Sequence, residues 1–262
     1  MITPYSPKRA RRFIEANTAI APLPHVPELR LHLADDELHR HAALVLVAEV
    51  VVGELARRLG LRVPRLTAVD LRAPIARYEA DEEVQDLLTA SVGLNLGVDL
   101  LPGAFAYDGS IPPPADEAAT ILWLDAFTAN IDRTPHNPNL VRWHGQTWCI
   151  DHGAALYFHY SWPSKGSHPE RFAAQRFDLG SHIMAGVVDP SPAAAAAAHE
   201  RLAALVTPGL LREILTLVPD EWLETSESMP HADDVRAAYV ENLLARLAAP
   251  QAWSPAFAGE MR

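Results

Sequence analysis

The segment that most constrains how this chain can fold is a polar run, residues 130–139, which separates two apolar stretches. Residues 116–129, before it, have the apolar content of a buried helix. Residues 139–143 and 146–150, after it, are two short segments joined by His144 and Gly145, which predicts a tight β-hairpin with glycine in the turn. A hairpin brings its two ends together, so we expect the polar run to lie beside residues 151–153, which follow the hairpin.

This geometry brings three oxygen-bearing side chains into one small space: Asp132, Asn137 and Asp151. Two carboxylates and an amide oxygen at close range suit a hard cation such as Mg²⁺. Asp132 and Asn137 have the spacing of the catalytic loop of protein kinases, and Asp151 begins an Asp-x-Gly sequence like the kinase Asp-Phe-Gly. Either aspartate alone would be an ordinary turn residue, but the combination predicts a phosphoryl-transfer site.

Longer runs around these residues resemble the HipA-like kinase family. The runs read WLDAFTANIDRT, NPNL and IDHGAAL at residues 123–134, 137–140 and 150–156. Further similarity lies upstream, at residues 46–49, 53–64, 93–97 and 101–104, and the resemblance extends over about residues 44–223.

The resemblance implies an α+β, two-lobed protein-kinase-like fold with a small partial N-lobe and a mostly helical C-lobe. Residues 1–40 are expected to form a divergent N-terminal segment, and residues 41–105 the remainder of the N-lobe with the hinge. Residues 106–249 are expected to form a helical C-lobe with the catalytic loop, and residues 250–262 a tail.

The resemblance also implies roles for individual residues. Asp132 would be the catalytic aspartate, and Asn137 and Asp151 would hold Mg²⁺ against ATP. Leu101 and Gly103 would belong to the hinge that contacts the adenine. The implied reaction is transfer of the γ-phosphate of ATP to a hydroxyl group, which we expect to be on a serine of a protein substrate.

Glu49 is the only charged residue in the apolar stretch 44–52, and a buried carboxylate needs a cationic partner. In an active kinase this partner is a strand lysine that also holds the ATP phosphates, so Glu49 belongs to the expected nucleotide site. The chain has only two lysines, Lys8 and Lys165, and neither lies on the preceding predicted strand.

The N-terminal part departs from the family in a second respect, since no glycine-rich phosphate loop precedes Glu49 and Gly53 is the first glycine. Residues 29–33 alternate as a strand does, and Arg30 within them is a candidate substitute for the lysine. These departures predict weak ATP turnover.

Two other functions remain open. One is a metal-dependent hydrolase that uses Asp132, His136, Asp151 and His152, although none of these histidines forms a helical His-x-x-x-His pair. The other is a kinase-fold binding or regulatory protein with impaired catalysis, which the absence of the lysine favours.

The remaining expectations concern secondary structure. Helices are predicted at residues 41–59, 86–94, 193–206, 208–218 and 232–247, and extended segments at residues 64–71 and 96–101.

Composition bounds the partners and the compartment. A net charge of −11 argues against a nucleic-acid-binding surface. Cys149 is the only cysteine, so the chain can form no intrachain disulfide, and we expect a cytoplasmic protein. The most apolar segment, residues 42–52, is interrupted by Glu49 and is too short to span a bilayer, so no membrane association is expected.

Overall fold

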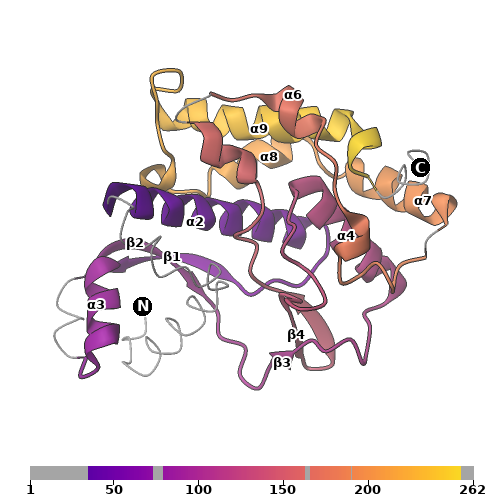
Figure 1. The fold of residues 1–262 in the computed structure, drawn as a ribbon, viewed down its shortest axis with the longest axis horizontal. Coiled ribbons are helices and arrows are strands. Elements are labelled where there is room, and N and C mark those ends of the chain that lie inside the picture. Colours follow the sequence, from indigo (N-terminus) through magenta and orange to yellow (C-terminus); the bar gives the residue numbers. More distant parts are fainter. Residues whose placement is uncertain (1–34, 73–78, 163–165, 190, 255–262) are drawn as a thin grey trace. The chain divides into compact units, whose positions relative to one another are not determined.

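The computed structural model describes residues 35–72, 79–162, 166–189 and 191–254 (Figure 1). The chain forms two compact units. One holds the described residues up to Leu38 together with Pro64–Pro102, and the other holds His39–Val63 and the described residues from Gly103 onward. Helices and small antiparallel sheets occur together, which confirms the α+β class. The predicted strand at residues 29–33, with Arg30, lies outside the described residues, as do Lys8 and Lys165.

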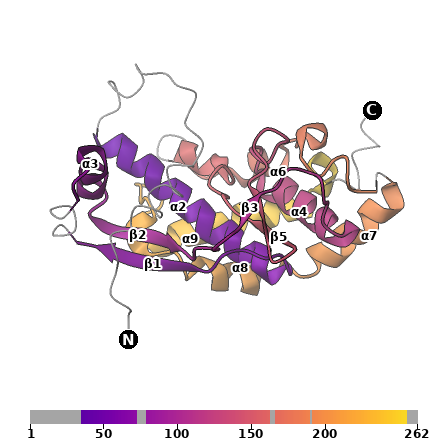
Figure 2. The same cartoon turned by 90° about the horizontal axis from the view of Figure 1, so that it is seen from below.

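The smaller unit is built on two antiparallel strands, β1 (Leu66–Leu71) and β2 (Gly93–Val98), which lie side by side in Figure 2. Helix α3 (Glu82–Ala90) covers the end of this pair, where Leu71 and Leu88 are buried. The helix lies four residues earlier than its predicted range of 86–94, and the second strand begins three residues before its predicted start at 96. Gly93, whose φ of +122° favours glycine, turns the chain between them.

Helix α2 (Asp35–Arg58) begins six residues before its predicted start. Its predicted apolar stripe is buried: Leu44, Val47, Val51 and Leu55 are each at most 4% exposed. The helix ends where Gly60 adopts a left-handed conformation, with φ +89°.

Helix α4 (Ala115–Thr128) is buried along most of its length and forms the centre of the larger unit. The ring of Trp123 stacks on that of Phe127 at a centroid distance of 5.1 Å and meets Trp253 edge-on at 5.5 Å. Ala129 ends the helix in the left-handed conformation and donates its N–H to the carbonyl of Asp125.

The described part of the larger unit contains a three-stranded sheet, ordered β3 (Phe105–Ala106), β4 (Leu140–Trp143) and β5 (Gln146–Cys149). Strands β4 and β5 form the predicted hairpin. His144 and Gly145 connect them with φ values of +48° and +74°, the pattern of a type I′ turn. The register pairs Leu140 with Cys149, so the two ends of the hairpin are adjacent, as predicted.

The rest of the larger unit is helical. The α-helices are α6 (Pro169–Ala173), α7 (Pro192–Ala203), α8 (Pro208–Leu215) and α9 (Ala232–Ala248), and the 3₁₀ turns are η3 (Tyr157–Ser161), η4 (Leu179–Ser181), η5 (Asp220–Trp222) and η6 (Pro250–Ala252). The three helices predicted in this region are confirmed, and α6 and α8 pack against α9 (Figure 1). Among the described residues, no helix is long and apolar enough to cross a membrane.

His159 in η3 is a buried titratable group away from the polar loop. One of its ring nitrogens, Nδ1, lies 2.8 Å from the hydroxyl of Tyr239 on α9. Burial, with a smaller contribution from His41, lowers the pKa of His159 to about 3. The folded protein therefore holds this side chain neutral at a pH where an unfolded chain, with a histidine pKa of about 6.5, binds a proton.

We therefore predict that the fold loses stability as the pH falls below about 6.5. Above that pH, His159 is neutral in both states. Below it, only the unfolded chain takes the proton, so the free energy of unfolding falls by up to about 1.4 kcal/mol per pH unit until the folded form titrates. The substitution His159→Asn should flatten the pH dependence of the urea midpoint. Tyr239→Phe should lower stability but keep the slope, and an unchanged slope in His159→Asn would contradict the prediction.

Candidate active site

The loop between α4 and β4 carries the predicted catalytic residues. It is a compact turn, because the N–H of Thr134 bonds to the carbonyl of Asp132 at 3.0 Å and the N–H of Asn137 returns to the carbonyl of Thr134 at 3.1 Å. Asn139, with φ +47°, then directs the chain into β4. The loop is thus fixed at both ends, by the end of α4 and by the start of the hairpin.

Asp132 is held by two amide side chains of its own loop. Nδ2 of Asn137 donates to Oδ2 of Asp132 at 2.7 Å, and Nδ2 of Asn139 donates to the same oxygen at 3.1 Å. A carboxylate can only accept, so both amide nitrogens must face Asp132. This leaves Oδ1 of Asp132 and Oδ1 of Asn137 for other partners. Sequence reasoning identified Asp132 and Asn137 but missed Asn139.

Asp151 follows β5 and lies close to Asp132. Burial of Asp151, and next the charge of Asp132, raise the pKa of Asp151. Its backbone has φ +54°, a left-handed conformation in which Asp and Asn are the most tolerated residues after glycine. The hairpin therefore brings the two aspartates together, as the sequence predicts.

Glu49, on α2, reaches the same place within the larger unit. Its Oε1 accepts the N–H of His152 at 2.8 Å, and its carboxyl lies near enough to Asp151 for their charges to interact. Burial and the charge of Asp151 raise the pKa of Glu49, and the main-chain N–H groups of residues 152 and 153 offset part of that rise. Within the part of the chain that the structure describes, no lysine or arginine forms an ion pair with Glu49.

Gly153 allows this close approach of α2 to the segment after β5. A Cβ at Gly153 would lie 2.7 Å from Cγ1 of Val45 and 3.4 Å from Oε1 of Glu49. We predict that Gly153→Ala lowers the free energy of unfolding by about 1–3 kcal/mol, as overpacking does. Gly186→Ala is the matched control, since a Cβ there meets no atom within 4 Å. Equal urea midpoints for the two variants would contradict the predicted contact.

Arg133 ties the loop to the hairpin from inside the core. Its side chain is fully buried and donates from Nε to Oδ2 of Asp125 at 2.6 Å. Nη1 donates to the carbonyls of Asn139 and, at 3.4 Å, of Ile150, while Nη2 lies 3.3 Å from Nδ1 of His152. One guanidinium thus contacts both ends of the hairpin.

Asp125 anchors this network from α4. It accepts from Nε2 of His182 at 2.9 Å and from Nδ2 of Asn130 at 3.1 Å. Burial alone would raise the pKa of Asp125, but Arg133 and His182 more than offset this and hold it below its usual value. Sequence reasoning missed this network. The available signal was Asp125 itself, a single charge on the apolar face of a helix, as Glu49 is.

The hinge residues lie where the two units meet along the chain. Leu101 follows β2 in the smaller unit, and Gly103, with φ +79°, begins the larger one. Their contact with adenine stays a prediction.

The donor set fits a magnesium ion of the kind that kinases use. The carboxylate of Asp151, Oδ1 of Asn137 and the nearby Asp132 are hard oxygen groups. Burial, and next the charge of Asp132, raise the pKa of Asp151, and a cation between the two carboxylates would relieve the repulsion between them. Among the described residues, no three His, Cys, Asp or Glu side chains gather as a metal-binding group. The four ligands of the hydrolase hypothesis are therefore not brought together, and Nδ1 of His152 faces Arg133 instead.

A family model described as HipA-like kinase matches residues 39–256. No curated protein and no solved structure matches the chain.

Proposed function

The chain belongs to the HipA-like kinase family, and on that premise we propose that it transfers the γ-phosphate of ATP to the hydroxyl of a protein serine, with Mg²⁺. The observation that carries this proposal is the convergence of Asp132, Asn137 and Asp151 at the two ends of one hairpin. The serine acceptor rests on the family resemblance.

Asp132 would accept or orient the proton of the attacking hydroxyl. Its Oδ2 is occupied by Asn137 and Asn139, so Oδ1 is the atom available to the substrate. A base held by two donors within its own loop is oriented before substrate arrives, which lowers the entropic cost of the reaction.

Asn137 and Asp151 would hold the magnesium ion. The ion would neutralise charge on the ATP phosphates as the phosphoryl group moves. Asn137 would offer Oδ1, because its nitrogen is committed to Asp132, and Asp151 would offer its carboxylate. Glu49, whose Oε1 is bonded to the N–H of His152, would fix the position of the segment that carries Asp151.

The proposed organisation is two-lobed. We assign residues 41–105 to an N-lobe remainder with the hinge at Leu101 and Gly103, and residues 106–249 to the C-lobe. Residues 1–40 would be the divergent segment and 250–262 the tail.

The proposal is tested by titrating ATP with and without Mg²⁺. We predict that Asp151→Ala weakens binding in the presence of Mg²⁺ by about tenfold or more, the equivalent of one charge-assisted contact, and leaves metal-free binding nearly unchanged. Stability should also fall by about 1 kcal/mol, because alanine is strained at the left-handed backbone of Asp151.

Asp108→Ala is the matched control, since Asp108 is an exposed carboxylate that accepts hydrogen bonds from the N–H and hydroxyl of Ser110 in its own turn. If Asp151→Ala and Asp108→Ala bind ATP equally well with Mg²⁺, Asp151 is not a metal ligand and the proposal fails.

A second candidate function is nucleotide binding without efficient turnover. It is favoured by the environment of Glu49, which has no ion-pair partner among the described residues and whose raised pKa favours the protonated form. A protonated carboxyl attracts a phosphate-binding cation less strongly than the ionised glutamate of an active kinase does. Measured ATP affinity in the micromolar range, together with no detectable ATP hydrolysis or autophosphorylation, would select this function over the first.

A further inference from the structure

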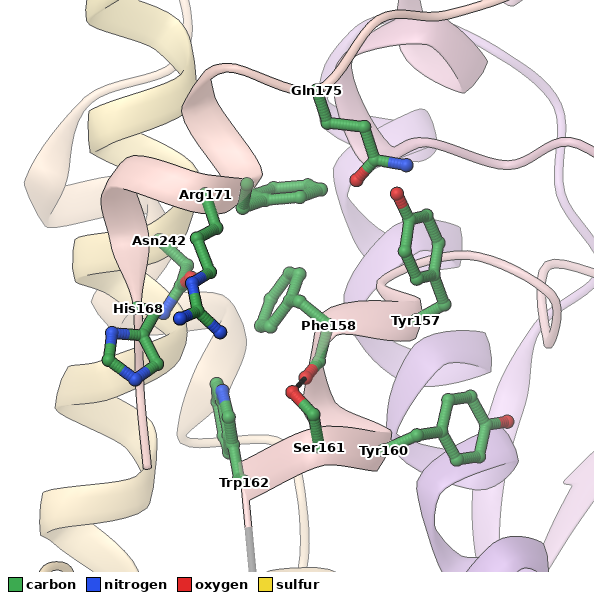
Figure 3. Close-up of a pocket in the computed structure, with 10 residues that line it drawn as sticks. Tyr157, Phe158, Tyr160, Ser161, Trp162, His168, Arg171, Gln175 and Asn242 are labelled. Carbon is green, nitrogen blue, oxygen red and sulfur yellow. Dashed lines mark hydrogen bonds between the residues drawn. The ribbon is translucent and has the colours of Figure 1, made fainter. Parts of the chain in front are cut away.

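A second site lies in the larger unit, away from the polar loop. Elements η3, α6 and α9 line a cavity of about 400 Å³ that is partly open to solvent (Figure 3). Half of its lining residues are aromatic, and the others are polar or charged: Ser161, His168, Arg171, Gln175 and Asn242. This size and lining are those of a small-molecule pocket.

The aromatic wall is fixed by its own packing. The rings of Phe158 and Phe172 lie 4.4 Å apart between centroids, and those of Phe158 and Trp162 lie 5.3 Å apart. Trp162 also meets Tyr239 of α9 edge-on at 4.6 Å. Rings held on several sides keep the cavity open without a ligand and offer faces and edges to a further ring.

Asn242 is one of the residues that line this cavity, and its side chain is fully buried. Its Nδ2 donates to the carbonyl of Ala238 and to Oγ of Ser167, each at 2.8 Å. A backbone carbonyl can only accept, so the nitrogen must face Ala238, which fixes the orientation of the amide. The buried Oδ1 is then left without a hydrogen-bond partner among the described residues. A buried acceptor of this kind costs about 1–3 kcal/mol unless a donor reaches it.

The rim of the cavity carries positive charge. Arg171 on α6 is exposed, forms no ion pair with any described residue, and in Figure 3 extends toward the same space as the rings of Phe158 and Trp162. His168 is already engaged by Glu170, at 3.1 Å, so Arg171 is the cation available to an anionic group.

We propose that this cavity binds a small aromatic carboxylic acid that carries an O–H or N–H donor on its ring. The ring would pack against Phe158, Trp162 and Phe172, the donor would bond to Oδ1 of Asn242, and the carboxylate would pair with Arg171. The proposal concerns a site distinct from the phosphoryl-transfer residues and stands or falls independently of them.

The first test is calorimetric titration of the full chain with three probes. 4-Hydroxyphenylacetate has the ring, the donor and the acid, phenylacetate lacks the donor, and 4-methylphenol lacks the acid. We expect 4-hydroxyphenylacetate to bind at least about tenfold more tightly than either of the others, since each loses one buried or charge-assisted hydrogen bond. Absence of saturable binding by 4-hydroxyphenylacetate, or equal affinity for all three, would overturn the proposal.

The second test assigns the contacts. Arg171→Gln should weaken 4-hydroxyphenylacetate by about tenfold and leave 4-methylphenol unchanged, because only the acid pairs with the guanidinium. Arg176→Gln is the matched control, an exposed arginine on the same segment outside the cavity. Equal effects of the two arginine variants would contradict the site.

Asn242 is tested by a comparison of two variants. Asn242→Leu removes Oδ1 and should abolish the advantage of 4-hydroxyphenylacetate over phenylacetate, whereas Ser167→Ala removes only a partner of Nδ2 and should preserve it. If Asn242→Leu does not fold, the arginine variants still decide the outcome. ATP should not displace the probe from this cavity. If ATP displaces the probe equally well from the parent and from Arg171→Gln, the probe lies in the nucleotide site and the proposal is overturned.

Discussion

Replacing Asp132 by asparagine should reduce phosphoryl transfer by about 100-fold or more, the usual contribution of a general base. An amide at this position can still accept hydrogen bonds from Asn137 and Asn139 through its oxygen, so the loop keeps its shape. Its other atom, however, becomes an NH₂ group that cannot accept the proton of a substrate hydroxyl. The expected result is a protein that folds and binds ATP but transfers phosphate slowly or not at all.

The measurement is autophosphorylation or ATP hydrolysis at saturating Mg²⁺, with thermal melts of both proteins. Asp116→Asn is the control, an exposed aspartate in the first turn of α4. Parent-like turnover in Asp132→Asn, with a matching melt, would remove Asp132 from the mechanism. If the parent protein shows no measurable turnover but binds ATP in the titration described above, nucleotide binding without turnover is its function instead.

Local periodicity is the part of this fold that the sequence predicts well. The stripe of α2, the apolar helix α4 and the hairpin β4–β5 follow from side-chain spacing over a few residues and from a His-Gly turn with two positive φ values. The proximity of Asp132 to Asp151 follows as well, because a hairpin of known register fixes the distance between its ends.

Contacts between distant segments could not be predicted in the same way. Asp125 and His182 are 57 positions apart, and no spacing rule connects them. The five-residue helix α6 is too short to show a helical period in its apolar residues. The cavity that it forms with η3 and α9 could therefore not be predicted from the hydrophobic pattern. The sequence does show single charged residues within apolar helices, at Asp125 and at Glu49. Such a residue indicates a buried polar network, but it does not identify the residues that pair with it.

Arg133→Met should strongly destabilise the larger unit. The guanidinium is fully buried, and its removal leaves Asp125 as a buried carboxylate with one fewer cation and leaves the carbonyls of Asn139 and Ile150 without this donor. Breaking a buried ion pair by removing one partner costs about 3–5 kcal/mol. For a unit of this size, that corresponds to a fall in Tm of roughly 6–20 °C.

A double-mutant cycle separates this network from a simple loss of packing. Asp125→Asn alone leaves Arg133 as an uncompensated buried cation and should also be destabilising. The variant with both substitutions has neither charge, so its loss of stability should be smaller than the sum of the two single losses by roughly 1–3 kcal/mol. Arg176→Met, at an exposed position, should leave Tm nearly unchanged. Because Arg133 contacts both ends of the hairpin, ATP affinity with Mg²⁺, measured well below the Tm, should fall along with stability. Strict additivity in the cycle would show that Asp125 and Arg133 do not stabilise each other. Parent-like affinity in folded Arg133→Met would show that the hairpin alone positions Asp132 and Asp151.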